Sequence, residues 1–386
     1  MLAVGFFMVA LGLFLVSPVL VGLLSLVPMV VDHRNIAGWG LFFAAAAAVF
    51  MSQVTPTPDM DLYRYQLLMA EYEGSPMADV LGIIWGGSDP MSYTLMYLVS
   101  GALGPRAIPA ASAMLGYSVL FYVLGRVIQK TDASRTVALA AVVVFLCSHH
   151  LINVFTGFRF GLGVTLFVAG VVLQEVDGRV AGSVVLLLGS VLFHSSMLLL
   201  LLIYALIVLT QRLPLGVRLA AVGLFGGLTS LMVDFARQIG AFSWFVSYAQ
   251  SAEFYLSGYS PGGDWFLFQV STGVLMVLAS WVCLRAVGRD GCGALTSALM
   301  GAVAMAGLLM ITNFHIATRL FTVSRLLFVI ALLCALARPL RVGDRVVLLG
   351  IAAVTALGMV WNQFSALVAI GGLGALYSSF SFGAFR

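Results

Sequence analysis

Long apolar runs repeat along almost the whole of this chain, and they constrain its fold more than any other feature. Each run is about 17 to 25 residues long, which is the length that a helix needs to cross the roughly 30 Å hydrocarbon layer of a bilayer. Of the 386 residues, 62% are hydrophobic and 9% are charged. Soluble domains carry about 25% charged residues. The sequence therefore predicts an all-α polytopic membrane protein.

Hydropathy and helix-breaking residues predict about 12 transmembrane helices, within a range of about 11 to 13, in a single integral membrane domain over residues 1–386. The expected segments lie near residues 3–29, 36–52, 107–127, 136–153, 160–176, 180–194, 196–210, 218–234, 264–286, 294–313, 319–337 and 345–362. A thirteenth is placed near 364–380. Residues 91–103 are too short to span and are expected to form a re-entrant piece or a tilted half-helix. The first segment is too long for a signal peptide.

The distribution of basic residues predicts the orientation of these segments, because short cytoplasmic loops are enriched in Lys and Arg. Alternate connections carry the basic residues Arg34, Arg126, Lys130, Arg135, Arg179, Arg212, Arg218, Arg285, Arg289, Arg338, Arg341 and Arg345. We expect these loops in the cytoplasm, and they are too short to hold a nucleotide-binding domain. The long connections 53–90 and 235–263 then lie outside the cytoplasm and are expected to cover the site.

The remaining composition excludes two classes of site. The basic residues do not cluster on a soluble face, so a nucleic-acid partner is not expected. The cysteines show neither a CxxC pair nor the spacing of metal ligands, so neither a disulfide framework nor a structural metal site is expected. They are Cys147, Cys283, Cys292 and Cys334.

The first outer loop is rich in acidic residues and begins TPTPDMDLYRYQLLMAEYEG. Thr57 suits the N-cap of a helix and Pro58 its first position. Apolar and aromatic residues then recur at helical spacing, at Leu62, Tyr65, Leu68, Met69 and Tyr72. This pattern predicts an amphipathic helix on the outer membrane surface with its apolar face toward the lipid. Asp61, Arg64 and Tyr65 fall within one turn of it.

The stretch GFRFGLGVTLF places Arg159 between two apolar runs. An arginine at bilayer depth costs about 2.5–3.5 kcal/mol, so it usually faces a polar cavity, a partner or a ligand. Neighbouring glycines let other helices approach it. The same topology puts further arginines at the outer side or inside a segment, namely Arg64, Arg237, Arg319 and Arg325. A bound polyanion would account for the group, because guanidinium groups grip phosphate bidentately. Snorkelling of Arg159 to lipid phosphates is the alternative.

Three further stretches carry residues suited to catalysis or binding. LFHSSMLLLLL interrupts an apolar run with His194 at an outer helix end. Histidine titrates near neutral pH and suits a general base or a hydroxyl-binding group; a contact with a backbone carbonyl at the helix break is the structural alternative. Asp89 precedes Pro90 at the entry to a membrane segment, which fits an N-cap as readily as a catalytic role. The aromatic loop 242–266 fits an interfacial belt or sugar stacking.

Four stretches, in this order, resemble the EpsG/Wzy family of bacterial O-antigen and exopolysaccharide polymerases: DLYRYQ, DPMSYTLMYLVS, FRFGLGVTLFVAG and LFHSSMLLL. The resemblance covers most of residues 55–210 and continues only loosely to ATRLF around Arg319. It implies a GT-C-like fold, that of multi-span glycosyltransferases that take lipid-linked donors at the outer face of the inner membrane. Family members often carry Gln after the membrane arginine, whereas Phe160 stands here.

The resemblance also implies the residues of the site. It points to Asp61, Arg64 and Tyr65 in the first stretch, to Asp89 and Pro90, to Arg159, and to His194 and Ser196. Arg159 is expected to stabilise the departing diphosphate. Asp61 or His194 is expected to accept the proton of the attacking hydroxyl, and the choice between them stays open. The remaining substrate-binding residues are expected to be Arg64, Tyr65, Asp89, Ser196, Arg319 and Arg325.

We expect the protein to move a growing glycan from undecaprenyl diphosphate to the non-reducing end of another lipid-linked repeat unit. It would lie in the bacterial inner (cytoplasmic) membrane with its site facing the periplasm or exterior. The expected partners are that lipid-linked oligosaccharide, the bilayer and a chain-length regulator protein. No cofactor is required, because arginines supply the positive charge, although the acidic loop is compatible with a divalent metal. Two alternatives remain: a GT-C transferase using a polyprenyl-monophosphate sugar, and a flippase or transporter for lipid-linked oligosaccharide.

Overall fold

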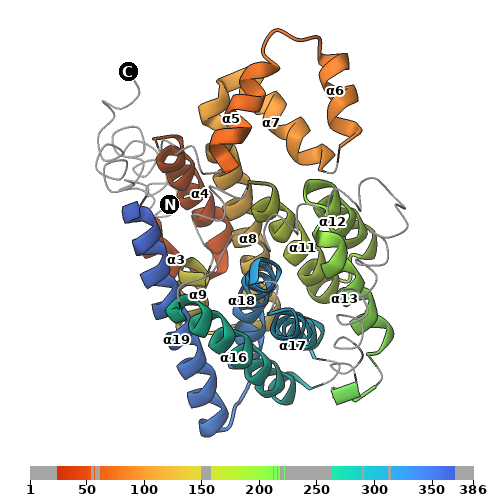
Figure 1. Cartoon of the computed structure of the whole chain (residues 1–386). Coiled ribbons are helices and arrows are strands. Elements are labelled where there is room, and N and C mark those ends of the chain that lie inside the picture. Colours follow the sequence, from red (N-terminus) through yellow and green to blue (C-terminus); the bar gives the residue numbers. More distant parts are fainter. Residues whose placement is uncertain are drawn as a thin grey trace. The chain divides into compact units, whose positions relative to one another are not determined.

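The computed structural model of the chain describes residues 24–53, 56, 61–87, 89–148, 158–211, 213–214, 216–217, 221, 263–288, 291–311 and 314–369. Every regular element in these ranges is a helix, as predicted (Figure 1). Six of the described helices are long and apolar enough to cross a membrane, and four more are apolar but shorter. These helices indicate a multi-pass membrane protein. The total of about 12 spans and the GT-C-like fold stay predictions.

The chain forms two compact units, which we call unit 1 (Met1–Met197 with Met359–Arg386) and unit 2 (Leu198–Gly358). The described helices of unit 1 are α3 (Leu26–Val31), η1 (His33–Asn35), α4 (Ile36–Gln53), α5 (Asp61–Glu71), α6 (Met77–Trp85), α7 (Pro90–Leu103), η2 (Pro105–Ala107), α8 (Ile108–Thr131), α9 (Arg135–Ser148), α11 (Phe158–Asp177) and α12 (Val180–Phe193). Those of unit 2 are α13 (Met197–Leu209), α16 (Gly263–Val287), α17 (Ala294–Leu309), α18 (Phe314–Leu336) and most of α19 (Val342–Ala369). The single membrane domain expected from the sequence stays a prediction.

Most of the predicted segments that fall on described residues correspond to single helices, from α4 to α18. The C-terminal end differs from the expectation, because α19 continues without a break to Ala369. Residues 364–369 therefore extend the twelfth predicted segment and do not open a thirteenth. Asn362 and Gln363 are polar, but neither disrupts a helix as proline or glycine does. Nearly all of the segments 218–234 and 3–29 lies outside the described residues.

The predicted outer helix is present as α5, although Thr57 and Pro58 lie outside the described residues. The face that carries Leu62, Tyr65 and Met69 is buried, as the spacing predicts. It packs against α7 and η2 and does not face lipid. An apolar face is buried by neighbouring protein as well as by a membrane. The short stretch 91–103 supplies that protein, because it forms the 14-residue helix α7, which also contacts α6, α8 and α12 (Figure 1).

Glycines set the close approach of α11 and α12 in unit 1. A Cβ atom added at Gly163 would stand 3.3 Å from His194 Cβ and 3.1 Å from Met197 Cγ. One added at Gly170 would stand 2.9 Å from Leu187 Cγ. Small residues allow membrane helices to pack at such short range. This packing brings the end of α12, with His194, beside the first turns of α11.

The loops predicted to share the cytoplasmic face lie together at one end of unit 1. Arg34 pairs with Asp132 at 2.9 Å, and Arg126 pairs with Asp177 at 2.7 Å. Asp177 is the last residue of α11, a helix of 20 residues. Such a helix is about 30 Å long, so this basic end of unit 1 is well separated from Phe158, where α11 begins.

In unit 2, α16, α17 and α18 pack against one another, and α18 is almost wholly buried. Short polar side chains bond across these helices. Ser280 Oγ donates to the Ser297 carbonyl at 2.6 Å, and Ser324 Oγ donates to the Met300 carbonyl at 2.8 Å. Such bonds satisfy polar groups that have no access to water in a membrane helix bundle.

Candidate active site

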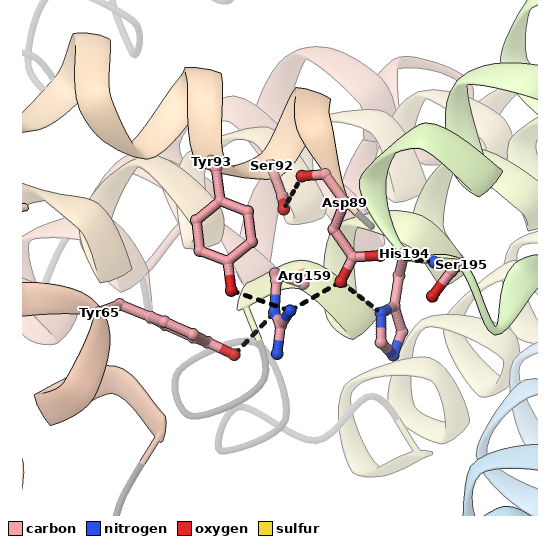
Figure 2. Close-up of polar contacts among 7 residues, drawn as sticks. All are labelled: Tyr65, Asp89, Ser92, Tyr93, Arg159, His194 and Ser195. Atoms are coloured by element: carbon pink, nitrogen blue, oxygen red, sulfur yellow. Dashed lines mark hydrogen bonds and ion pairs between the residues drawn. The ribbon is translucent and has the colours of Figure 1, made fainter. Parts of the chain in front are cut away.

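Arg159 lies in the first turn of α11 and makes several contacts in a polar cluster of unit 1 (Figure 2). Its Nε donates to the Tyr65 hydroxyl at 2.8 Å. Its Nη1 donates to Asp89 Oδ2 at 2.7 Å and to the Tyr93 hydroxyl at 3.0 Å. Its side chain is 24% exposed. We call the following residues the Asp89 cluster: Tyr65, Asp89, Tyr93, Arg159, His194 and Ser195.

Asp89 joins Arg159, His194 and Ser195, and its side chain is only 2% exposed. It occupies the N-cap position of α7, before Pro90, but its carboxylate makes no capping hydrogen bond. Instead Oδ2 accepts from Arg159 and lies 3.2 Å from His194 Nδ1. Oδ1 accepts the backbone N–H of Ser195 at 2.8 Å. The residue therefore has the N-cap position that the sequence suggested, with its side chain turned into the cluster.

His194 reaches this carboxylate because α12 ends beside it. The backbone at His194 is extended, with φ −156° and ψ 117°, and α13 begins shortly afterwards. The break turns both the imidazole and the Ser195 N–H toward Asp89 (Figure 2). Phe160 meets the imidazole edge-on, with ring centroids 5.9 Å apart and an interplanar angle of 86°. Phe160, which stands where the resemblance leads us to expect Gln, therefore packs on the histidine.

Two tyrosines hold the guanidinium of Arg159 from α5 and α7. Tyr65 and Tyr93 pack edge-to-face with centroids 6.3 Å apart, and Arg159 Cζ lies 5.1 Å and 5.3 Å from their centroids. Cation–π attraction thus adds to the two hydrogen bonds. Both hydroxyl oxygens accept from Arg159, so each phenol keeps its own proton for a further acceptor.

The electrostatics of the cluster favour an ionised carboxylate beside neutral phenols. Burial alone would raise the pKa of Asp89, but the hydrogen bond to His194 and the electrostatic interactions with His194 and Arg159 lower it. These interactions and a backbone N–H together hold the pKa of Asp89 below its ordinary value. Burial raises the pKa of Tyr65 and Tyr93, and Arg159 offsets this only in part.

One edge of the Arg159 guanidinium is not used by the cluster. Within the part of the chain that the structure describes, Nη2 makes no hydrogen bond, whereas Nε and Nη1 do. Figure 2 shows this nitrogen pointing away from Asp89. The cluster therefore fixes the orientation of the guanidinium and leaves two N–H groups to receive an oxygen of a ligand.

Asp61 and Arg64 share a turn of α5, as expected. Among the described residues, neither of them makes a hydrogen bond to a member of the Asp89 cluster. They pair with each other at 3.6 Å, and their side chains are 37% and 58% exposed. Such exposed pairs are worth about 0–1 kcal/mol. Asp61 is near enough for its charge to raise the pKa of Tyr65 and Tyr93. The predicted roles of Asp61 and Arg64 stay predictions.

The other predicted arginines lie in unit 2, on α18. Arg325 is buried at 1% exposure, and it donates to Gln269 Oε1 at 3.2 Å and to Thr322 Oγ1 at 2.9 Å. Neither partner carries a charge, so this guanidinium lacks a carboxylate partner among the described residues. Arg319 lies about two turns earlier on the same helix. Binding of a diphosphate by either residue stays a prediction.

The remaining predictions concern Ser196, the second long loop and a metal site. Ser196 follows the cluster directly, and its Oγ is buried with no hydrogen-bond partner among the described residues. Arg237 and all but the last residue of the loop 235–263 lie outside the described residues. No group of three or more His, Cys, Asp or Glu side chains gathers as a metal site in the described ranges. That the reaction requires no cofactor stays a prediction, and so does its compatibility with a divalent ion.

Sequence reasoning missed Tyr93, the backbone of Ser195 and the contact of Phe160. Tyr93 had a usable sequence signal, because it follows Asp89 by four residues and residues at that spacing share a helix face. The backbone N–H of Ser195 had no such signal, because any residue other than proline at position 195 would supply it. Phe160 looked like a missing polar group, but the polar partners of Arg159 come from α5 and α7.

Comparison with known proteins gives a family for this chain. A family model described as the EpsG family matches residues 38–371, a range that includes the whole Asp89 cluster. The chain belongs to the EpsG family. This is the family of Wzy/EpsG-type polymerases, so membership supports a polysaccharide-polymerase-like function of the glycosyltransferase type. Comparison with curated proteins and with solved structures finds no match.

The geometry of this EpsG-family protein provides two chemical capabilities at one place. Arg159 can stabilise negative charge through its unused edge. Because Nδ1 of His194 faces Asp89, Nε2 is the ring nitrogen that can accept a proton, as in Asp–His pairs of hydrolases. The two groups share one carboxylate oxygen, Asp89 Oδ2, which fixes their separation.

Proposed function

We propose that this protein is a polysaccharide polymerase that transfers a growing glycan from undecaprenyl diphosphate to the non-reducing end of another lipid-linked repeat unit. The reaction takes place at the outer face of the cytoplasmic membrane, and the Asp89 cluster is its active site. One observation supports this most: a single buried carboxylate holds both an arginine and a histidine at the end of unit 1 away from its basic loops.

Arg159 stabilises the leaving group in this proposal. Cleavage of the anomeric C–O bond leaves its electron pair on the diphosphate, where negative charge grows. The two N–H groups of Nη2 meet a diphosphate oxygen, and the phenol protons of Tyr65 and Tyr93 are available to neighbouring oxygens. Because the guanidinium is already held on its other edge, little reorganisation is needed when the charge develops.

His194 accepts the proton of the attacking hydroxyl. Its Nδ1–H donates to Asp89, which fixes the tautomer and leaves Nε2 as the base. Asp89 is a positioning residue here, since it acts through His194 and Arg159. We prefer His194 to Asp61 as the base, because Asp61 is paired with Arg64 on the exposed side of α5. Arg319 and Arg325 remain proposed ligands of the diphosphate.

The orientation follows from the positive-inside rule applied to unit 1. The Arg34–Asp132 and Arg126–Asp177 pairs mark the end expected in the cytoplasm, and the cluster lies at the other end of α11. A donor for such a site must reach it from the membrane, which fits a polyprenyl-linked sugar. A chain-length regulator would be a further partner.

Purified protein in lipid nanodiscs tests the proposal, with a synthetic undecaprenyl-diphosphate-linked repeat unit as substrate and products resolved by size. The wild type should give a ladder of products spaced by whole repeat units. Arg159→Ala and His194→Ala should each abolish the ladder while the protein still enters the membrane. Arg126→Ala is the matched control, because it removes the other arginine of unit 1 that pairs with an aspartate at 2.7 Å.

Three outcomes would refute parts of this proposal. Addition of one sugar per turnover from a polyprenyl monophosphate would identify a different transferase. Movement of the lipid-linked unit across a vesicle membrane without new glycosidic bonds would identify a flippase. Normal ladders from both site variants would place the active site elsewhere.

A further inference from the structure

A cavity of about 520 Å³ lies between the C-terminal ends of α5 and α7 in unit 1. Ligand pockets in proteins range from about 300 to 1,000 Å³, so the cavity is large enough for a small organic group. Its lining includes Tyr72, Glu73, Tyr97, Gly101 and Gly104. None of these residues belongs to the Asp89 cluster.

The cavity adjoins the cluster along the same two helices. Tyr65 and Tyr93 hold Arg159, and the residues one turn further along α5 and α7 are Met69 and Tyr97, which line the cavity. Residues four positions apart lie above one another on a helix face. A ligand bound at the cluster would therefore reach the cavity if it extended along the two helices by the length of one or two turns.

The end of α7 leaves carbonyl groups that can accept hydrogen bonds in the cavity, while the hydroxyl of Tyr97 already donates to the Ser75 carbonyl at 3.4 Å. α7 ends at Leu103, and the last carbonyl groups of a helix lack partners within it. The cap N–H of Gly104 satisfies only the Ser100 carbonyl. These carbonyls carry the negative end of the helix dipole, and the carboxylate of Glu73 adds a full negative charge beside them. Tyr72 and Tyr97 add aromatic surface.

We infer that this cavity is a saccharide subsite that holds sugar rings of the lipid-linked glycan while the diphosphate lies at Arg159. A sugar offers hydroxyl donors around its rim and a less polar C–H face, and these match the carbonyls, the carboxylate and the tyrosine rings. A diphosphate would be repelled by Glu73 and by the end of α7. The inference rests on the proposed function and assigns the carbohydrate part of its substrate.

Gly101 permits a direct test, because its position can be filled without disturbing the protein. A Cβ atom added there meets nothing within 4 Å, and the residue lies in helical backbone without a positive φ. Gly101→Phe should therefore occupy the cavity. Gly82→Phe is the matched control, since Gly82 lies in the neighbouring α6, is exposed, also has open space around its Cβ, and does not line the cavity.

The experiment measures two binding constants in nanodiscs by isothermal titration. One probe is the free repeat-unit oligosaccharide released by mild acid from the lipid-linked intermediate of the producing cells. The other is undecaprenyl diphosphate without sugar. Gly101→Phe should weaken binding of the oligosaccharide about tenfold or more, equivalent to about 1.4 kcal/mol, and leave undecaprenyl diphosphate unchanged. Gly82→Phe should change neither. Tyr97→Ala gives a second variant that removes aromatic surface without adding bulk.

Each result decides the inference. Equal oligosaccharide binding by wild type, Gly101→Phe and Tyr97→Ala would overturn it, as would no binding of the oligosaccharide to wild type. A selective loss of undecaprenyl diphosphate binding in Gly101→Phe would show that the cavity holds the lipid part instead. These failures leave polymer synthesis by the wild type intact. Failure of the proposed function would appear separately, as normal ladders from Arg159→Ala and His194→Ala.

Discussion

Two arginine–aspartate pairs of unit 1 have the same length and different surroundings. Arg126 pairs with Asp177 at the end of α11, and Arg159 pairs with Asp89 at its start, each at 2.7 Å. All three guanidinium nitrogens of Arg126 are bonded within the protein, two to Asp177 and one to Gln129. Arg159 uses two nitrogens and leaves the third.

The difference shows that two ion pairs of equal length can leave different numbers of donors for a further ligand. Arg126 and its carboxylate satisfy each other bidentately beside another arginine, Arg179, at 4.0 Å. Asp89 instead divides its oxygens among an arginine, a histidine and a backbone N–H, and tyrosines support the arginine. A pair that is incomplete on one edge, yet held firmly on the other, is prepared for a ligand.

Loss of the shared carboxylate should have the largest effect. Asp89→Ala leaves the partly buried Arg159 without its counter-ion and frees His194, so polymer should disappear and the free energy of unfolding should fall by about 3 kcal/mol. Asp177→Ala should leave polymer synthesis in place and cost about 1 kcal/mol, as more exposed pairs do. Ladder formation and denaturant-induced unfolding measure the two effects. Equal loss of polymer in both variants would abolish the distinction between the pairs.

A change of arginine geometry at constant charge should have the next largest effect. Lysine is a single point charge and cannot bond Tyr65, Tyr93 and a ligand in one plane. Arg159→Lys should lower the rate of polymer elongation by about 10²–10³, the usual loss for one preorganised donor. Arg126→Lys should change the rate little. Single-turnover elongation rates check this, and an active Arg159→Lys would mean that charge alone suffices.

Removal of one supporting hydroxyl should have a smaller effect. Tyr93→Phe deletes one hydrogen bond to a charged group, which is worth about 1.5–3 kcal/mol when the group is otherwise unchanged. Tyr65 and the carboxylate still hold Arg159, so we expect a loss of elongation rate near tenfold. Tyr122→Phe is the control, because it removes an exposed hydroxyl of α8 outside both the cluster and the cavity. If both variants behaved alike, the hydroxyl of Tyr93 would have no role in holding the arginine.

The smallest effect is the pH dependence of stability. The pKa of Asp89 is held below its ordinary value of 3.8, so its carboxylate stabilises the folded state at every pH above 3.8. That contribution is lost only as pH falls through the lowered pKa. The difference in unfolding free energy between wild type and Asp89→Asn should therefore persist through mildly acidic pH and shrink below 3.8. A difference that vanished already well above that pH would show that the carboxylate is not held ionised.

Much of the fold was predictable because it depends on local sequence. Apolar runs bounded by charges or helix breakers became α4, α8, α11 and α16, and the helical spacing around Tyr65 became α5. What covers the apolar face of α5 was not predictable, since periodicity shows that a face is buried but does not show whether lipid or protein buries it. The end of α19 was misplaced because polar residues alone do not stop a helix.

The candidate site also has a part that the sequence predicted and a part that it did not. The sequence indicated Tyr65, Asp89, Arg159 and His194 through short motifs, and it suggested that several arginines share one anion. In the structure, a carboxylate and two tyrosines surround Arg159, and both arginines of α18 belong to unit 2. Asp61, which its position beside Arg64 made attractive, forms an exposed pair on α5.

The sequence by itself determined that this chain is a bundle of membrane helices with ionisable groups at one level, because hydropathy and helix spacing act over one or two turns. Only the tertiary structure decided which of those groups meet. Asp89 contacts Arg159 and His194, which are 70 and 105 positions away in the sequence. Those contacts depend on the close packing of α11 and α12 at Gly163 and Gly170 and on the break after α12. Contacts at such separations are fixed by packing, which no local pattern encodes.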